Sequence, residues 1–183
     1  MNSPFKKLIL TLFVISFFSC TEDLYFKQAE DLDIKPVYNS SLTYFTVLPI
    51  NFFDDNGVLI NNSITDSSVI RAFENAFLRE HIFQLDLDVI CKNEFSRDIS
   101  IKIEFLDGNG NATYPSINLK VVAENLNFED KKVIVIADNI AILNTLIVRI
   151  TTEIEATGIP INASEDLEFE LKSALTGYIR SSL

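Results

Sequence analysis

The segment His81–Cys91, HIFQLDLDVIC, decides the fold class of this chain. Apolar and polar residues alternate strictly from Phe83 to Val89. A period of two is that of a β-strand with one buried and one exposed face, and it excludes an α-helix. We therefore predict a half-buried strand, with these residues inward: Phe83, Leu85, Leu87, Val89 and Cys91; and these outward: Gln84, Asp86 and Asp88.

A second alternating segment, ISIKIEF, covers Ile99–Phe105 and leads into the sequence DGNGN at 107–111. Its isoleucines and its phenylalanine point one way, and Ser100, Lys102 and Glu104 point the other. Asn-Gly and Asp-Gly steps favour tight hairpin turns. We predict that this strand lies beside the His81–Cys91 strand and ends in a hairpin.

Further strands are predicted from the same signals, with turn residues between them. The earliest, at 42–47, is apolar on both faces, which is typical of a buried strand. In all, seven or eight strands are expected, the others at 114–122, 133–137, 147–155 and 167–175.

One short amphipathic helix is predicted between the first two strands. Asp66 or Ser67 would cap it, and Ile70, Phe73 and Phe77 would share its apolar face at spacings of three and four. A further helical turn is predicted at 138–146, between two late strands.

Strands with one apolar face, joined by short turns, bury that face when two antiparallel sheets pack face to face. The predicted fold class is therefore mainly all-β, a two-sheet β-sandwich. Its architecture resembles that of immunoglobulin-like or transthyretin-like lipoprotein domains. The Cys and Trp hallmarks of true immunoglobulin domains are missing, since the chain has no Trp.

The 183 residues include 26 acidic and 15 basic side chains, a formal net charge of −11. Nucleic-acid binding requires clustered Lys and Arg that displace counterions from phosphates, and this chain has no such cluster. Basic partners or divalent cations would be attracted instead.

The N-terminus has the order of an export signal. Lys6 and Lys7 precede an uncharged, mainly apolar stretch at 8–18, and Ser19 stands directly before Cys20. The stretch is about half of the roughly 20 residues that a membrane-spanning helix needs. This order predicts a signal peptide at 1–19 rather than a transmembrane segment.

The sequence Ser16-Phe17-Phe18-Ser19-Cys20 resembles the relaxed lipobox of bacterial lipoproteins, particularly those of the Bacteroidota. The resemblance implies cleavage before Cys20, a diacylglyceryl group on its thiol, and anchorage in the outer membrane. Thr21-Glu22-Asp23 resembles short acidic signals for export to the cell surface, and it equally fits a solvated start of the mature chain. An acidic tether at 20–30 and a single domain at 31–183 complete the predicted organisation.

The residues that carry chemistry favour structural roles. His81 is the only histidine, so zinc sites built from several imidazoles are excluded, and no G-x-S-x-G sequence accompanies it. Asp107, Asn109 and Asn111 match the first half of an EF-hand loop. Ala112 and Asn118 stand where that loop needs a glycine and a bidentate glutamate, so a plain turn is favoured. The sequence DDNG at 54–57 also has the residue types of a plain turn. We predict no catalytic residue, metal site or cofactor.

Seven acidic residues are expected on outward faces of strands. They would form a surface for cations or a basic partner, or a solvated face that pairs with Lys102, Arg149 and Lys172. Cys91 is expected to be an inert core thiol, and acylation of Cys20 would leave it no disulfide partner. The seven are Asp86, Asp88, Glu104, Glu153, Glu155, Glu168 and Glu170.

Anchorage without catalytic signatures predicts a non-catalytic interaction or accessory subunit of an outer-membrane β-barrel complex. The alternative is a lipoprotein that binds a glycan, peptide or cation for a transporter. The cell-surface side of the outer membrane is slightly favoured over the periplasmic side.

Overall fold

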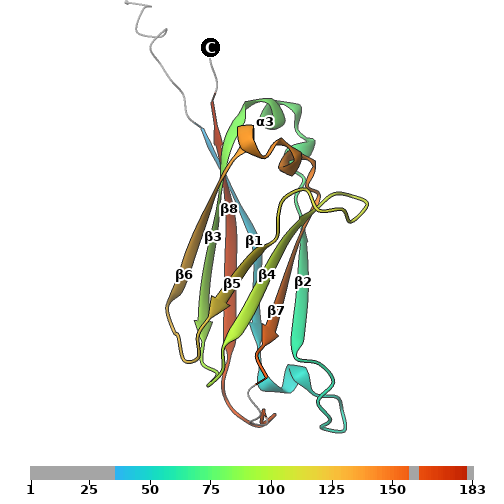
Figure 1. Cartoon of the computed structure of the whole chain (residues 1–183), viewed down its shortest axis with the longest axis vertical. Coiled ribbons are helices and arrows are strands. Elements are labelled where there is room, and N and C mark those ends of the chain that lie inside the picture. Colours follow the sequence, from blue (N-terminus) through green and yellow to red (C-terminus); the bar gives the residue numbers. More distant parts are fainter. Residues whose placement is uncertain (1–35, 157–160, 181–183) are drawn as a thin grey trace, which may run out of the picture. The chain divides into compact units, whose positions relative to one another are not determined.

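A computed structural model describes residues 36–156 and 161–180 (Figure 1). The predicted signal peptide, Cys20 and the tether lie outside the described residues. Within them the chain is built from eight strands, one α-helix and four short 3-10 helices. The predicted all-β sandwich is confirmed.

Two four-stranded sheets face each other, and every strand pair is antiparallel. The first sheet has the order β1-β8-β3-β6 and the second β2-β7-β4-β5 (Figure 1). In the first sheet the strands are β1 Val37–Val47, β8 Phe169–Ile179, β3 Ile82–Asn93 and β6 Phe128–Val135. In the second they are β2 Ser63–Val69, β7 Ile147–Ile154, β4 Ile99–Leu106 and β5 Ile117–Val121.

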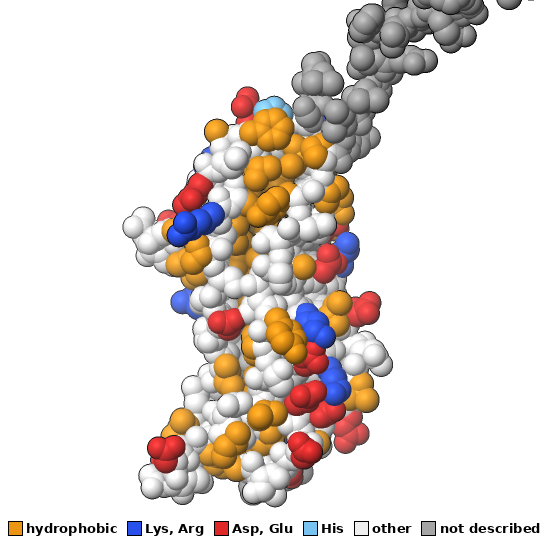
Figure 2. All heavy atoms as spheres, turned by 180° about the vertical axis from the view of Figure 1, so that it is seen from behind, with side chains coloured by type: hydrophobic (Ala, Val, Ile, Leu, Met, Phe, Trp, Pro, Cys, Tyr) orange, Lys and Arg blue, Asp and Glu red, His pale blue; other side chains and the backbone are white. Residues whose placement is uncertain are grey.

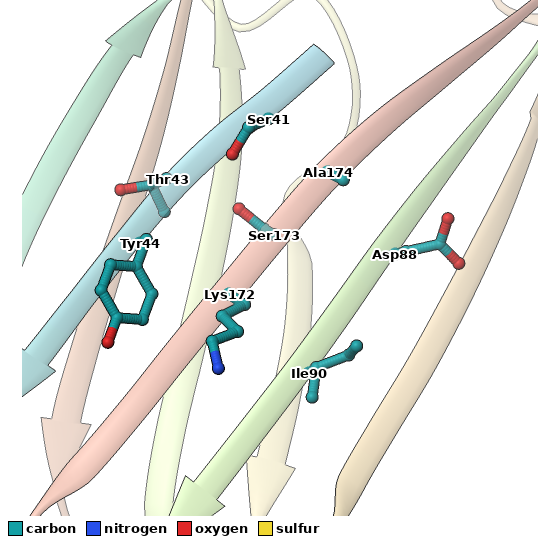
Figure 3. Close-up of a pocket in the computed structure, with 8 residues that line it drawn as sticks. All are labelled: Ser41, Thr43, Tyr44, Asp88, Ile90, Lys172, Ser173 and Ala174. Atoms are coloured by element: carbon teal, nitrogen blue, oxygen red, sulfur yellow. The ribbon is translucent and has the colours of Figure 1, made fainter. Parts of the chain in front are cut away.

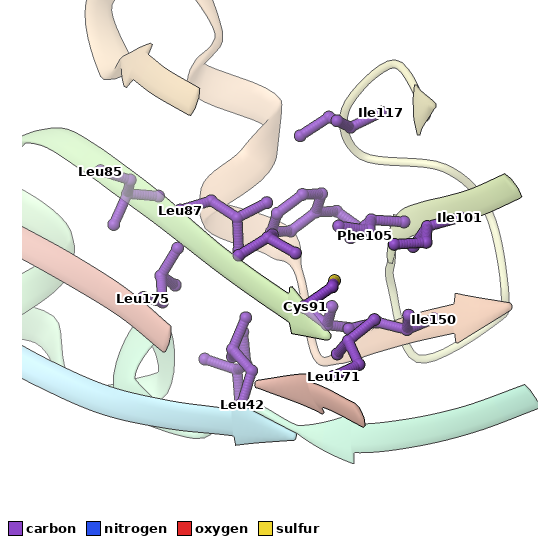
Figure 4. Close-up of a cluster of buried hydrophobic side chains, with 14 of the residues drawn as sticks. Leu42, Leu85, Leu87, Cys91, Ile101, Phe105, Ile117, Ile150, Leu171 and Leu175 are labelled. Atoms are coloured by element: carbon purple, nitrogen blue, oxygen red, sulfur yellow. The ribbon is translucent and has the colours of Figure 1, made fainter. Parts of the chain in front are cut away.

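The core lies between the sheets, where alternate side chains from both meet (Figure 4). Leu85, Leu87 and Cys91 of β3 are buried, as are Ile101 and Phe105 of β4. The alternation of these two segments predicted these residues as inward, and the structure confirms it.

The predicted pairing of the two strands is wrong. β3 and β4 lie in different sheets, because β3 pairs with β8 and β6 while β4 pairs with β7 and β5. The chain crosses between the sheets just after β3, where the buried Asn93 amide donates to the carbonyls of Arg97 and Val122 at 2.8 and 3.0 Å. When two strands lie in opposite sheets, the apolar face of each is buried against the other across the core.

The predicted helix cap is also wrong. Asp66 and Ser67 belong to β2, where Asp66 stands opposite Ile150 of β7. The α-helix is α3, Ala76–His81, and Asn75 caps it by accepting a hydrogen bond from the Leu78 amide at 3.1 Å. Strand pairing between residues far apart in the sequence overrides the local helical spacing.

The apolar face predicted for that helix does not form. Ile70 and Phe73 are buried, but they lie outside α3, and Phe77 within it is 48% exposed. The helical turn predicted between late strands is confirmed by two 3-10 helices, η3 Ile136–Asp138 and η4 Ile140–Asn144.

Phe83 and Tyr44, both predicted to lie in the core, are not buried in the structure. Pairing shifts between Ile82 and Gln84, so that Ile82 is buried while Phe83 is half-buried, its ring 4.8 Å from the Arg180 guanidinium. In β1, an edge strand, Tyr44 is 62% exposed, so the prediction that both faces of this segment are buried is wrong.

Candidate functional site

The outer face of the first sheet carries a shallow hollow with a volume of about 320 Å³ (Figure 3). Strand register explains it. Ser41 of β1, Ala174 of β8 and Asp88 of β3 stand opposite one another, and the next row along the sheet is Tyr44, Lys172 and Ile90. A row of small side chains beside a row of large ones leaves a depression.

The walls of the hollow combine an aromatic ring, an aliphatic chain and both signs of charge. The Lys172 ammonium lies 5.4 Å from the centre of the Tyr44 ring, within the range of a cation–π contact. Ile90, opposite Lys172, is 48% exposed. Such a surface suits a small amphipathic group.

The sequence pattern predicts Tyr44 in the core and Lys172 as a partner for acidic side chains, and it does not predict the hollow. The even-numbered residues of β8 share the outer face, and Ala174 is the smallest of them. This signal could be found only by knowing which strands flank β8, because the sequence of one strand does not reveal its neighbours.

Asp86 lies in a hydrogen-bonded cluster higher on the same sheet. Although it points outward, its residue is 4% exposed. Its carboxylate accepts hydrogen bonds from Gln84 Nε2 at 2.7 Å, the Tyr178 hydroxyl at 3.1 Å and Lys131 Nζ at 3.3 Å. Lys131 also lies 3.2 Å from Asp88, so one lysine holds both acids of the β3 strand.

The electrostatics of this cluster favour the ionised carboxylate. Burial of Asp86 raises its pKa, but the hydrogen bonds from Gln84, Lys131 and Tyr178 outweigh this and leave the pKa below its usual value. The hydrogen bond that Tyr178 donates to Asp86 raises the pKa of the tyrosine. Both shifts favour the ionised Asp86 and the neutral Tyr178, which are the forms that make this hydrogen bond. The cluster therefore has the character of a structural element rather than of a catalytic acid or base.

We predict that Asp86→Ala lowers the free energy of unfolding by about 1–3 kcal/mol at neutral pH, because three side-chain donors lose a buried acceptor. Asp88→Ala, the matched control on the same strand, should cost less than about 1 kcal/mol, since that acid is more exposed. Urea denaturation of the three proteins measures both effects.

The pH dependence of that difference follows from the sign of the shift. Because the folded-state pKa of Asp86 is lowered, its contribution is complete above the unfolded-state value of about 3.9 and is lost as the pH falls through the folded-state value. The gap between the wild type and Asp86→Ala should therefore narrow in acid. A gap that stays constant from pH 7 to pH 2.5 would contradict this assignment.

All seven outward acids have a partner within the chain. On the second sheet, Arg149 binds Glu104 across the strand pair with nitrogen to oxygen distances of 2.9 and 3.0 Å. Lys102 lies 2.8 Å from the same carboxylate. Together they hold the pKa of Glu104 below its usual value, the hydrogen bond from Lys102 contributing most.

The remaining acids are held in the same way. Lys92 bridges Glu94 and Glu168 at 2.7 and 2.9 Å, and Lys172 pairs with Glu170. Three further contacts complete the set: Lys120 with Asp98 at 2.9 Å, Lys120 with Glu155 at 2.8 Å, and the Asn62 amide with Glu153 at 2.8 Å.

These acids do not form one surface, because they are divided between the two sheets. Asp86, Asp88 and Glu170 belong to the first sheet, and Glu104 and Glu153 to the second. Figure 2 shows the matching pattern on one face, where acidic and basic side chains lie next to each other. The arrangement is that of a solvated, internally paired sheet face.

His81 ends α3, and its side chain contacts Phe77 of the same helix. Its Nδ1 lies 2.9 Å from the Phe77 carbonyl oxygen, and its ring stacks on the Phe77 ring with centroids 4.4 Å apart. His81 lies at the junction of helix and strand, since β3 begins at the next residue.

Both acidic turns are closed by their own side chains. Asp107 Oδ1 accepts from the amides of Asn109 and Asn111, both at 2.8 Å. In the other turn, Asp54 Oδ1 accepts from the amides of Asn56 and Val58 at 2.9 and 2.8 Å. The carboxylate oxygens thus serve as turn acceptors, as the sequence predicted.

Cys91 is buried, and burial raises the pKa of its thiol to about 12. It is an unreactive core residue at neutral pH. Among the residues that the structure describes, no three His, Cys, Asp or Glu side chains are grouped to hold a metal ion. In the same ranges, no helix has the length and apolar character needed to cross a bilayer.

Comparison with known proteins gives no family. No family model matches the chain, and no characterised protein matches it in sequence. Among solved structures, it is similar to the VP2 subviral particle protein of infectious bursal disease virus, with 14% identity, a TM-score of 0.42, and coverage of 81% of this chain and 34% of that one.

Two other structural likenesses are of the same order. Tailspike protein 4 of bacteriophage CBA120 has 15% identity and a TM-score of 0.39, with coverage of 83% of this chain and 20% of that one. A protein of Parabacteroides distasonis has 11% identity and a TM-score of 0.46, with coverage of 63% and 37%. The chain spans about a third or less of the length of the viral proteins it matches, and likenesses at this level carry no argument about its function.

Proposed function

We propose that this protein is a lipoprotein of the outer membrane, held by an acylated Cys20, that acts as a non-catalytic interaction or accessory subunit of a β-barrel complex. The observation that carries the proposal is the N-terminal order of Lys6 and Lys7, the apolar stretch 8–18, and Cys20. Two or three acyl chains on one residue give stable membrane attachment, whereas a single chain gives only marginal binding.

The way the chain enters the sandwich supports the proposal that the anchor holds the whole domain at the membrane. The chain that leads from Cys20 enters the domain at Pro36, whose carbonyl accepts a hydrogen bond from the Ile179 amide at 3.1 Å. It then continues as β1, which pairs with β8 from Val37 to Val47. An anchor joined to a paired strand confines the whole folded domain to the membrane surface.

Purification of the full-length protein from envelopes solubilised in mild detergent tests this proposal. We expect recovery in a complex with a membrane protein. Recovery of the wild type as a lone monomer would contradict the proposed role. Protease treatment of intact cells separates the two membrane faces, since only a surface-exposed domain is digested.

The alternative, a ligand-binding lipoprotein that serves a transporter, is favoured by the hollow beside Tyr44. An exposed ring, an aliphatic wall and paired charges suit a small glycan or peptide. Thermal denaturation with a panel of oligosaccharides, peptides and divalent cations tests it. A rise in Tm that Tyr44→Ala abolishes would support ligand binding, and no shift with any of them would count against it.

A further inference from the structure

Residues 48–62, here called the distal loop, form an ordered projection between β1 and β2. The loop begins with the 3-10 helix η1, Pro49–Phe52, whose Phe52 side chain is buried. It then turns back on itself, and Phe53 and Leu59 form a β-bridge. The Ile60 amide donates to the Phe52 carbonyl at 2.9 Å, which fixes the returning segment against η1.

The tip of the distal loop is equally well defined. The Asp54 amide donates to the Val58 carbonyl at 2.9 Å, and Gly57 adopts the positive φ of 74° that the turn requires. The side chain of Asp54 closes the same turn, as described above. A loop held by these bonds presents its side chains without a large ordering cost on binding.

The distal loop displays three consecutive large aliphatic residues to solvent. Val58, Leu59 and Ile60 are 58%, 53% and 64% exposed, and Leu48 and Ile50 at its start are also exposed. Runs of three or four exposed apolar residues are errors in a folded protein unless they serve a function. This run therefore marks an interaction surface.

The position of the distal loop limits which partners can reach it. The anchor chain enters at the start of β1, and the loop follows the end of that strand, at the opposite end of the sandwich (Figure 1). Eleven strand residues span about 35 Å. The surface thus lies at the end of the domain opposite the start of β1, where the chain from Cys20 enters.

Charge narrows the choice of occupant further. The distal loop contains Asp54 and Asp55 and no Lys or Arg. An anionic lipid surface would be repelled, and so would a second copy, because a symmetric contact would bring the same aspartates together. We infer that the distal loop docks on a protein surface that offers an apolar hollow bordered by Lys or Arg. The inference rests on the proposed function and names the surface that serves it.

Site-specific photocrosslinking in cells that produce the full chain tests this inference. A photoreactive residue is placed at Ile60, and at Val133 of β6 as a control of comparable exposure. We expect a discrete protein adduct from position 60 and none from position 133. Mass spectrometry identifies the adduct, and the partner is then purified so that binding is measured directly.

Matched variants make the result specific. Val58→Ser, Leu59→Ser and Ile60→Ser together should weaken binding of the purified partner at least about tenfold. Val122→Ser, Leu126→Ser and Val133→Ser, which remove three aliphatic residues of similar exposure elsewhere, should leave binding unchanged. Asp55→Lys should also weaken binding, because it reverses a charge that the partner's Lys or Arg would meet. If the triple variant does not fold, Ile60→Ser alone replaces it in the binding measurement.

The failure of the inference is distinguishable from that of the proposed function. An adduct with lipid or with a second copy overturns the inference, and so does binding that the distal-loop variants leave unchanged. A complex that co-purifies while position 60 yields no adduct overturns the inference and leaves the proposed function standing. A wild type that is monomeric and yields no adduct at either position overturns both.

Discussion

Cys20→Ser is expected to move the protein from the membrane fraction to the soluble fraction almost completely. A serine hydroxyl does not replace the thiol in the acylation that the lipobox resemblance implies. Each buried methylene contributes about 0.8 kcal/mol to membrane binding, so loss of two or three acyl chains removes the attachment altogether. Fractionation of lysed cells after a carbonate wash, followed by immunoblotting, measures the distribution.

The chain provides its own control for this experiment. Cys91→Ser changes the other cysteine, which is buried in the core, and should leave the protein membrane-bound. The apolar segment 8–18 is too short to span the bilayer, so an uncleaved signal should not retain the variant after the wash. Equal amounts of Cys20→Ser and wild type in washed membranes would refute the anchor.

Phe105→Ala is expected to lower the free energy of unfolding by about 3–5 kcal/mol. The Phe105 side chain is 0% exposed, lies between the two sheets, and meets the Tyr114 ring edge to face with centroids 5.8 Å apart (Figure 4). Its truncation removes buried apolar contacts and leaves a cavity. A loss of this size is a large part of the 5–15 kcal/mol by which domains are stable.

Phe77→Ala is the matched control for the core substitution. This phenylalanine is half exposed and stacks only on His81, so its removal should cost less than about 1 kcal/mol. Chemical denaturation of both variants against the wild type gives the two values. Similar losses for Phe105→Ala and Phe77→Ala would show that the core does not lie between these sheets.

The sequence alone predicted the sandwich because periodicity in strands reflects burial on one face. The alternation in His81–Cys91 and in Ile99–Phe105 marked the residues that fill the core. It did not reveal which strands are neighbours, since two strands with apolar faces satisfy burial equally well side by side or across the core. The placement of β3 and β4 in different sheets depends on the chain crossing after Asn93.

Local signals also failed where distant pairing decided the structure. Asp66 and Ser67 have the residue types of a helix cap, yet pairing with β7 places them in a strand. The hollow beside Tyr44 and the bonds around Asp86 depend on strand order and register, which no single segment contains. The sequence shows that Val58–Ile60 is apolar, but only its exposure in the folded structure distinguishes it from a core strand.

The mass of the N-terminal peptide, from protein extracted out of membranes in detergent, tests the proposed anchor most directly. We expect a mature chain that begins at Cys20, lacks residues 1–19 and carries a diacylglyceryl group on the cysteine sulfur. An unmodified Cys20, or a mature chain that begins at another residue, would contradict it.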